Sequence, residues 1–128
     1  MNRTILVTGI VFGGLAVVLG AFAAHGLEAL LKPDQIETFE TGVRYQMYHA
    51  LLLLLVGGLQ QIPAPQKKWV YWSLTAGILL FSFSIYALAT NTLTAFDFKV
   101  IGFITPLGGV LLILGWVVFA LRVMRYVK

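Results

Sequence analysis

Four long stretches of the chain contain no charged residue. These stretches, each 22 to 28 residues long, are residues 4–27, 45–66, 69–96 and 100–121. A helix of about 20 mostly apolar residues crosses a hydrocarbon core about 30 Å thick. The pattern therefore predicts an all-α membrane protein, a four-helix bundle in a single transmembrane domain of residues 1–128. We expect its helices over about 4–26, 34–60, 69–91 and 99–124.

Small residues recur along one face of the first predicted helix. Their spacings are four, three, four and four residues, at Gly9, Gly13, Ala16, Gly20 and Ala24. Such a face allows the backbone of another helix to approach closely, which is how helices associate in lipid. We expect this face to pack within the chain, and a homo-oligomer contact is the alternative.

The segment 28–44 has the features of an amphipathic extension of the second helix on its outer side. Asp34, after Pro33, followed by Glu37, is typical of an N-cap with a capping-box partner. Glu40 and Arg44 have the spacing of a helical ion pair. Apolar residues at helical spacing follow the same segment, namely Ile36, Phe39, Val43 and Met47.

Proline and glycine residues predict two further local features of the helices. Pro106, flanked by Gly102, Gly108 and Gly109, falls inside the fourth predicted helix, where we expect it to produce a kink. Gly42, in the second helix, would permit close approach of another backbone. Together with the small-residue face, the predicted structural positions are Gly9, Gly13, Gly20, Gly42 and Pro106.

Composition narrows the class of protein further. The chain is 59% hydrophobic and 11% charged, whereas soluble domains are about 45–50% apolar and about 25% charged. It contains no cysteine, which excludes disulfides and thiolate metal sites. The excess of cations lies beside the predicted spans, so it does not indicate a nucleic-acid surface.

The distribution of charge predicts the orientation. The N-terminus, the 60–68 turn and the C-terminal tail carry six Lys and Arg residues and no acid, whereas the other two loops carry three cations and all five acids. Because cytoplasmic loops are enriched in Lys and Arg, both termini are expected in the cytoplasm. The predicted location is the bacterial inner (plasma) membrane, as a multi-pass protein.

The second predicted helix has an apolar run, residues 50–59, that is too short to span a bilayer by itself. The helix must draw polar residues before this run into the outer half of the membrane, where polar residues are candidates for function. The predicted ligand-binding positions are His25, Arg44, Tyr45, Gln46, Tyr48 and His49. Alternatively, these side chains satisfy one another's hydrogen bonds, and the tyrosines belong to an interfacial belt.

Familiar catalytic patterns are absent. The sequence has no GxSxG, Walker or HExxH motif, and two histidines are too few for a zinc centre without help from carboxylates. We therefore expect no enzymatic activity, no cofactor and no metal. Haem ligation by His25 and His49 is a less favoured alternative.

Five segments resemble a known bacterial membrane family. They are Gly20–Leu27, Glu40–Ala50, Phe81–Tyr86, Ile101–Gly109 and Gly115–Trp116, and the first two contain both histidines. The chain resembles domain-of-unknown-function family 423, small four-helix inner-membrane proteins related to transmembrane protein 256. The resemblance implies a small inner-membrane protein and supplies no catalytic residues.

The expected function is that of a structural or accessory membrane component with a polar interaction site in its outer half. One alternative is binding of a membrane amphiphile, a quinone or lipid headgroup, between Arg44, Tyr45, His49 and His25. A second alternative is an oligomeric channel or transporter. The expected partners are membrane lipids and either further copies of the chain or another membrane protein, with no nucleic acid.

Overall fold

The computed structural model describes all residues from 1 to 128 and is entirely helical. Four long helices are present, as predicted: α1 (Asn2–His25), α2 (Pro33–Gly58), α3 (Lys68–Ala89) and α4 (Ile104–Tyr126). Three short 3₁₀ segments lie in the connections: η1 (Ala64–Lys67), η2 (Asn91–Leu93) and η3 (Phe98–Ile101). The last helix begins five residues later than expected, because residues 98–101 form η3 instead.

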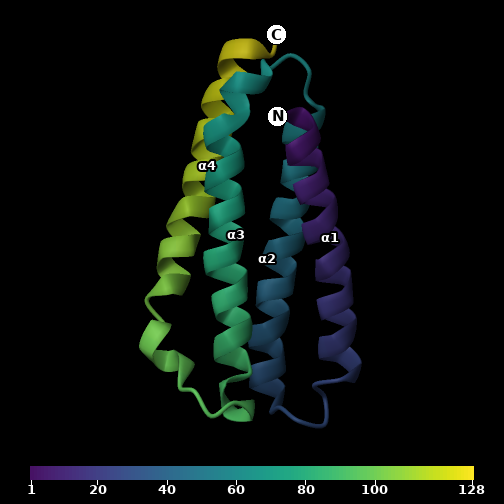
Figure 1. Ribbon diagram of the computed structural model, residues 1–128, viewed down its shortest axis with the longest axis vertical. Helices are drawn as coiled ribbons and strands as arrows, with labels where there is room; N and C mark the ends of the chain where they lie inside the picture. Colours follow the sequence, from purple (N-terminus) through teal and green to yellow (C-terminus); the bar gives the residue numbers. More distant parts are fainter.

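In Figure 1 the four helices follow one another across the molecule in chain order, and each packs along the next one in the sequence. Side chains also join α1 to α3, at Thr8 and Tyr71, and α2 to α4, at His49 and Trp116, whereas no extended contact joins α1 to α4. Both chain termini and the turn between α2 and α3 lie at one end of the molecule, here called the terminal end. The α1–α2 and α3–α4 connections lie at the opposite end, here called the loop end.

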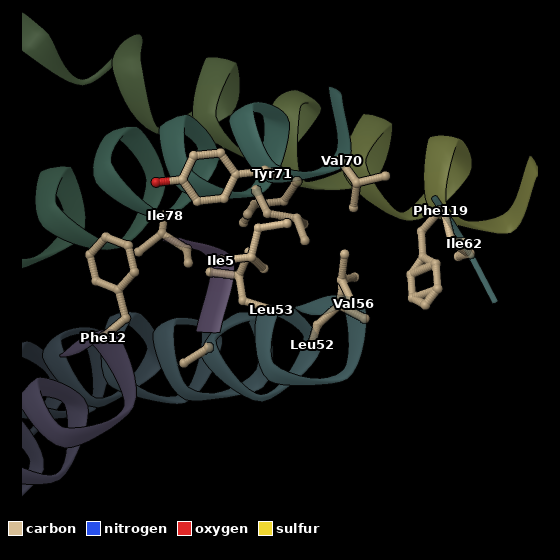
Figure 2. Packing of buried hydrophobic residues seen from close by; sticks show 13 residues of the cluster. Ile5, Phe12, Leu52, Leu53, Val56, Ile62, Val70, Tyr71, Ile78 and Phe119 are labelled. Carbon is tan, nitrogen blue, oxygen red and sulfur yellow. The ribbon is translucent and has the colours of Figure 1, made fainter. Parts of the chain in front are cut away.

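One apolar core holds the four helices together. It contains 13 buried residues from all four helices and from Ile62 in the α2–α3 turn (Figure 2). Ile5 of α1, Leu53 of α2 and Leu74 of α3 are completely buried in it. A smaller cluster, which includes Leu27 and Phe39, packs together at the loop end.

The outside of the protein is also apolar. Only 31 of 128 residues are buried, and large apolar side chains cover the outer faces of α1 and α4. Exposed apolar surface on this scale is suited to lipid rather than to water. Three helical segments are long and apolar enough to cross a membrane, namely Asn2–His25, Ala64–Ala89 and Phe98–Tyr126. The first third of α2 is charged, and α2 is not among them.

The helix α2 begins within one residue of its expected start, but the predicted N-cap is wrong. The N-cap is Lys32 rather than Asp34, and Pro33 is the first helical residue. Proline is favoured there because its fixed φ suits the first turn and its missing N–H would have no helical partner. The side chain that reaches back is Gln35, whose Oε1 accepts from the Lys32 backbone N–H at 2.9 Å.

Two other local predictions also differ from the structure. Pro106 is the third residue of α4, where a backbone N–H has no carbonyl to bond within the helix. It therefore lies in the first turn of α4 instead of kinking the helix interior. Arg44 donates from Nη2 to Thr41 Oγ1 at 3.0 Å, where we expected Glu40 to be its partner.

Glycines set the close approach between neighbouring helices. The small-residue face of α1 lies against α2: a Cβ added at Gly9 would be 3.0 Å from the Ala50 carbonyl oxygen. At the α3–α4 interface, a Cβ at Gly108 would overlap the backbone of Phe81. Among the glycines, Gly108 has the closest such approach, and the sequence analysis did not identify it.

We predict that Gly108→Leu destabilises the protein by at least about 1–3 kcal/mol, because overpacking displaces neighbouring groups. Here the neighbouring group is α3 backbone, which cannot move aside as a flexible side chain can. The matched control is Gly14→Leu, since Gly14 has nothing within 4 Å of its added Cβ. Thermal unfolding in detergent micelles measures both variants, and equal midpoints would contradict this packing.

Candidate functional site

Gln46, one of the predicted site residues, is fully buried and joins three helices. Its Nε2 donates to the Phe12 carbonyl oxygen of α1 at 2.8 Å. Its Oε1 accepts from the Tyr86 hydroxyl of α3 at 2.6 Å. Both ends of the amide are therefore bonded within the protein, and Gln46 fastens α2 between α1 and α3.

Other polar groups in the helices are paired in the same way. Ser82 Oγ of α3 donates to the Gly42 carbonyl oxygen of α2 at 2.8 Å. Ser84 of α3 and Thr105 of α4 share a hydrogen bond between their hydroxyls. Thr75 Oγ1 is the one buried side-chain oxygen without a partner. Such pairing is what a hydrocarbon surrounding requires, because no water is available there to satisfy polar groups.

His49 joins α2 to α4 through a defined tautomer. Its side chain is 5% exposed, and Nδ1 lies 2.6 Å from the Tyr45 carbonyl oxygen. Because a carbonyl oxygen only accepts, Nδ1 must carry the proton. Nε2 then accepts from the Trp116 indole N–H at 3.0 Å. Since the indole only donates, these two partners together fix His49 as the neutral Nδ1–H form.

A groove between α2 and α4 surrounds this hydrogen bond. The side towards the loop end is a cavity of about 310 Å³, here called the ring cavity. It is lined by Tyr45, His49, Phe81, Gly109, Leu112, Ile113 and Trp116. The side towards the terminal end is a cavity of about 330 Å³, here called the tail cavity. It is lined by Leu52, Leu55, Trp116, Phe119, Ala120 and Val123.

The remaining predicted site residues lie elsewhere. Arg44 lines a separate cavity of about 550 Å³ at the loop end, together with Glu28, Glu37 and Glu40. His25 is exposed at the end of α1 and lines none of the three cavities.

The predicted amphiphile site between Arg44, Tyr45, His49 and His25 is therefore not formed. Successive residues of a helix point about 100° apart, so Arg44 and Tyr45 face different neighbours. Tyr48 is 52% exposed, and its contact with the site is an aromatic one with Tyr45, whose ring centroid lies 5.6 Å from its own. Haem ligation by the two histidines also loses its basis, because both ring nitrogens of His49 are already hydrogen bonded.

Most of the groove was missed by the sequence analysis. Only Tyr45 and His49 were identified, and their spacing of four residues placed them correctly on one face of α2. The α4 residues that complete the ring cavity lie 60 or more positions away, and an isolated Trp116 in an apolar helix resembles any lipid-facing aromatic residue. The available signal was a lone tryptophan in the fourth predicted helix together with the histidine in the second.

Comparison with known proteins identifies the family. The family described as protein of unknown function DUF423 matches residues 19–109. The chain belongs to the DUF423 family. It is 35% identical to a UPF0382 membrane protein of Staphylococcus aureus (strain bovine RF122 / ET3-1), over 97% of this chain and 98% of that protein. It is 36% identical to UPF0382 membrane protein YwdK of Bacillus subtilis (strain 168), with the same coverage.

A third relative, from Staphylococcus saprophyticus, is 39% identical over 93% of this chain and 95% of that protein, and is also called a UPF0382 membrane protein. No solved structure matches the chain. The membrane class of these relatives agrees with the three long apolar helices of this DUF423 member. The protein is therefore an integral membrane protein of a bacterial family. The match to the DUF423 family ends at Gly109, so it includes the α2 wall of the groove and excludes Trp116.

We predict that Gln46→Leu lowers the free energy of unfolding by about 1–3 kcal/mol, because it leaves the half-buried hydroxyl of Tyr86 without its acceptor. Adding Tyr86→Phe should recover part of the loss, since the unpaired hydroxyl is then gone. Gln60→Leu, in the exposed turn after α2, is the control. Chemical unfolding in micelles gives the values, and a Gln46→Leu variant as stable as the control would show that the network contributes nothing.

Proposed function

We propose that the protein is a non-catalytic accessory component of the inner membrane, with four spans and both termini in the cytoplasm. The separation of charge supports this orientation. The six cations without acids all lie in segments of the terminal end, and the five acids all lie in segments of the loop end. The side enriched in Lys and Arg is the cytoplasmic side in membrane proteins.

The course of the chain supports α2 as the fourth span. α1 runs from the terminal end to the loop end, and α3 starts again at the terminal end. If α1 and α3 cross the bilayer, the chain between them must cross it as well. The uncharged stretch 45–66, which contains the inner two thirds of α2 and the following turn, provides most of that crossing, and Gln46 and His49 have protein partners along it.

The accessory role is supported by the way in which the polar groups are used. Gln46 and Ser82 bond to backbone carbonyls of neighbouring helices, so they contribute to packing. The surface left for interaction is the groove between α2 and α4, which opens sideways. In a bilayer that opening faces lipid, so we propose that the groove binds a membrane amphiphile. A channel would require several copies of the chain and remains a separate hypothesis.

The absence of native cysteine allows the topology to be tested with single introduced cysteines. We predict that Glu28→Cys and Thr92→Cys react with a membrane-impermeant maleimide in intact cells. Gln61→Cys and Lys128→Cys should react only after permeabilisation. Labelling of Gln61→Cys and Thr92→Cys from the same side would contradict four spans.

Extraction of the purified protein tests the groove. We predict that organic extracts of wild-type protein contain an amphiphile in near-stoichiometric amount, measured by mass spectrometry. Gly109→Leu should lose it, because Gly109 lines the ring cavity and a leucine would fill that space. Gly14→Leu, on the far side of α1, should retain it. An empty wild-type extract, or equal amounts in both variants, would reject the groove as a binding site.

A further inference from the structure

We propose that the groove between α2 and α4 recognises a neutral quinone, with its ring in the ring cavity and its apolar tail in the tail cavity. This inference rests on the proposed function, since it names the amphiphile that the groove would hold. It differs from a general lipid site because it predicts selection of an uncharged, planar, hydrogen-bond-accepting head.

The charge of the lining residues favours a neutral head. Neither the ring cavity nor the tail cavity has a Lys, Arg, Asp or Glu in its wall. His49, the one titratable imidazole, is held neutral by its two partners. Arg44, the cation that precedes Tyr45, lines the loop-end cavity instead. A phosphate in the ring cavity would lose its hydration without gaining a counter-charge, which is strongly unfavourable.

The shape of the ring cavity favours a flat ring. The aromatic side chains of Tyr45 and Phe81 form one wall, with ring centroids 5.2 Å apart. The rings of His49 and Trp116 meet edge to face with centroids 6.0 Å apart. The absence of a side chain at Gly109 leaves space beside Phe81. Aromatic walls suit offset or edge contacts with another ring, and small-molecule sites begin at about 300 Å³.

The ring cavity offers one side chain that is free to hydrogen bond with a ligand. The Tyr45 hydroxyl makes no hydrogen bond within the protein and is 40% exposed. The Trp116 indole N–H has His49 Nε2 as its present partner. The carbonyl oxygens of a quinone accept hydrogen bonds and have no proton to donate, so they match the free Tyr45 hydroxyl.

The tail cavity extends the groove for a single chain. Its side chains are all apolar, and it follows α4 from Trp116 to Val123, a distance of about 10 Å at the helical rise. Trp116 lines both cavities, so the two cavities lie on either side of this side chain. A tail leading from one to the other would pass over it. The combination of one polar head and one linear tail describes a quinone better than a two-chain phospholipid.

Fluorescence of Trp116 provides the test. The chain has three tryptophans, and both Trp69 and Trp72 are exposed on α3. In the Trp69→Phe/Trp72→Phe double variant, studied in phosphatidylcholine nanodiscs, all tryptophan emission comes from Trp116. We expect decylubiquinone to quench this emission saturably. In a Trp116→Phe variant, which keeps the other two tryptophans, quenching should rise linearly without saturation.

Variants in the same background locate the ligand. Tyr45→Phe should raise the half-saturation concentration about 2- to 10-fold, the effect of one lost hydrogen bond. Gly109→Leu and Ile113→Phe, which both fill the ring cavity from α4, should each abolish saturation. Tyr48→Phe, outside the cavity, should change nothing, and circular dichroism confirms that each variant is folded.

Competition separates the ligand classes. Menaquinone-4 should itself quench Trp116 saturably, whereas phosphatidylglycerol, which does not quench, should leave the half-saturation concentration of decylubiquinone unchanged. Linear quenching in the Trp116-only protein, or competition by phosphatidylglycerol, overturns the quinone assignment. If extraction nevertheless yields an amphiphile that is not a quinone, the groove is still a binding site and only the quinone assignment fails. If extraction yields none, the proposed function fails first.

Discussion

The structure depends on one constraint: a polar group inside a bilayer must find its partner within the protein. The second helix is where this constraint is most demanding, because its apolar run is short and polar residues precede it. Gln46 resolves it with bonds to α1 and α3, and His49 resolves it with a bond to α4. Gln46 and His49 would destabilise α2 in the membrane if they were unpaired, and their hydrogen bonds determine which helices lie beside it.

The shape of the molecule follows from how differently its helix pairs are joined. Glycines bring the backbones of α1 and α2, and of α3 and α4, into close approach, at Gly9 and Gly108 respectively. Between α2 and α4 there is no extended contact, and the hydrogen bond from Trp116 to His49 bridges the gap. A tight interface excludes ligand, whereas a bridged gap leaves space on both sides of the bridge. The candidate site thus exists because one interface is incomplete.

Much of the fold could be predicted from the positions of charged residues, because burial in lipid restricts charge over whole helices. Features decided by single residues could not: Pro33 displaced the expected cap at Asp34, and the late start of α4 placed Pro106 in its first turn. The site was predicted only along one helix. Tyr45 and His49 share a face by helical geometry, whereas the approach of Trp116 depends on packing between distant segments.

The most direct test of this account is the tautomer of His49, observed by nitrogen-15 NMR of the protein in lipid with labelled histidine. The account predicts that Nδ1 is protonated and that Nε2 is an unprotonated acceptor, coupled to the Trp116 indole proton. Trp116→Phe should shift the Nε2 resonance and leave His25 unchanged. A protonated Nε2, or a His49 spectrum that Trp116→Phe does not alter, would contradict the bridge between α2 and α4.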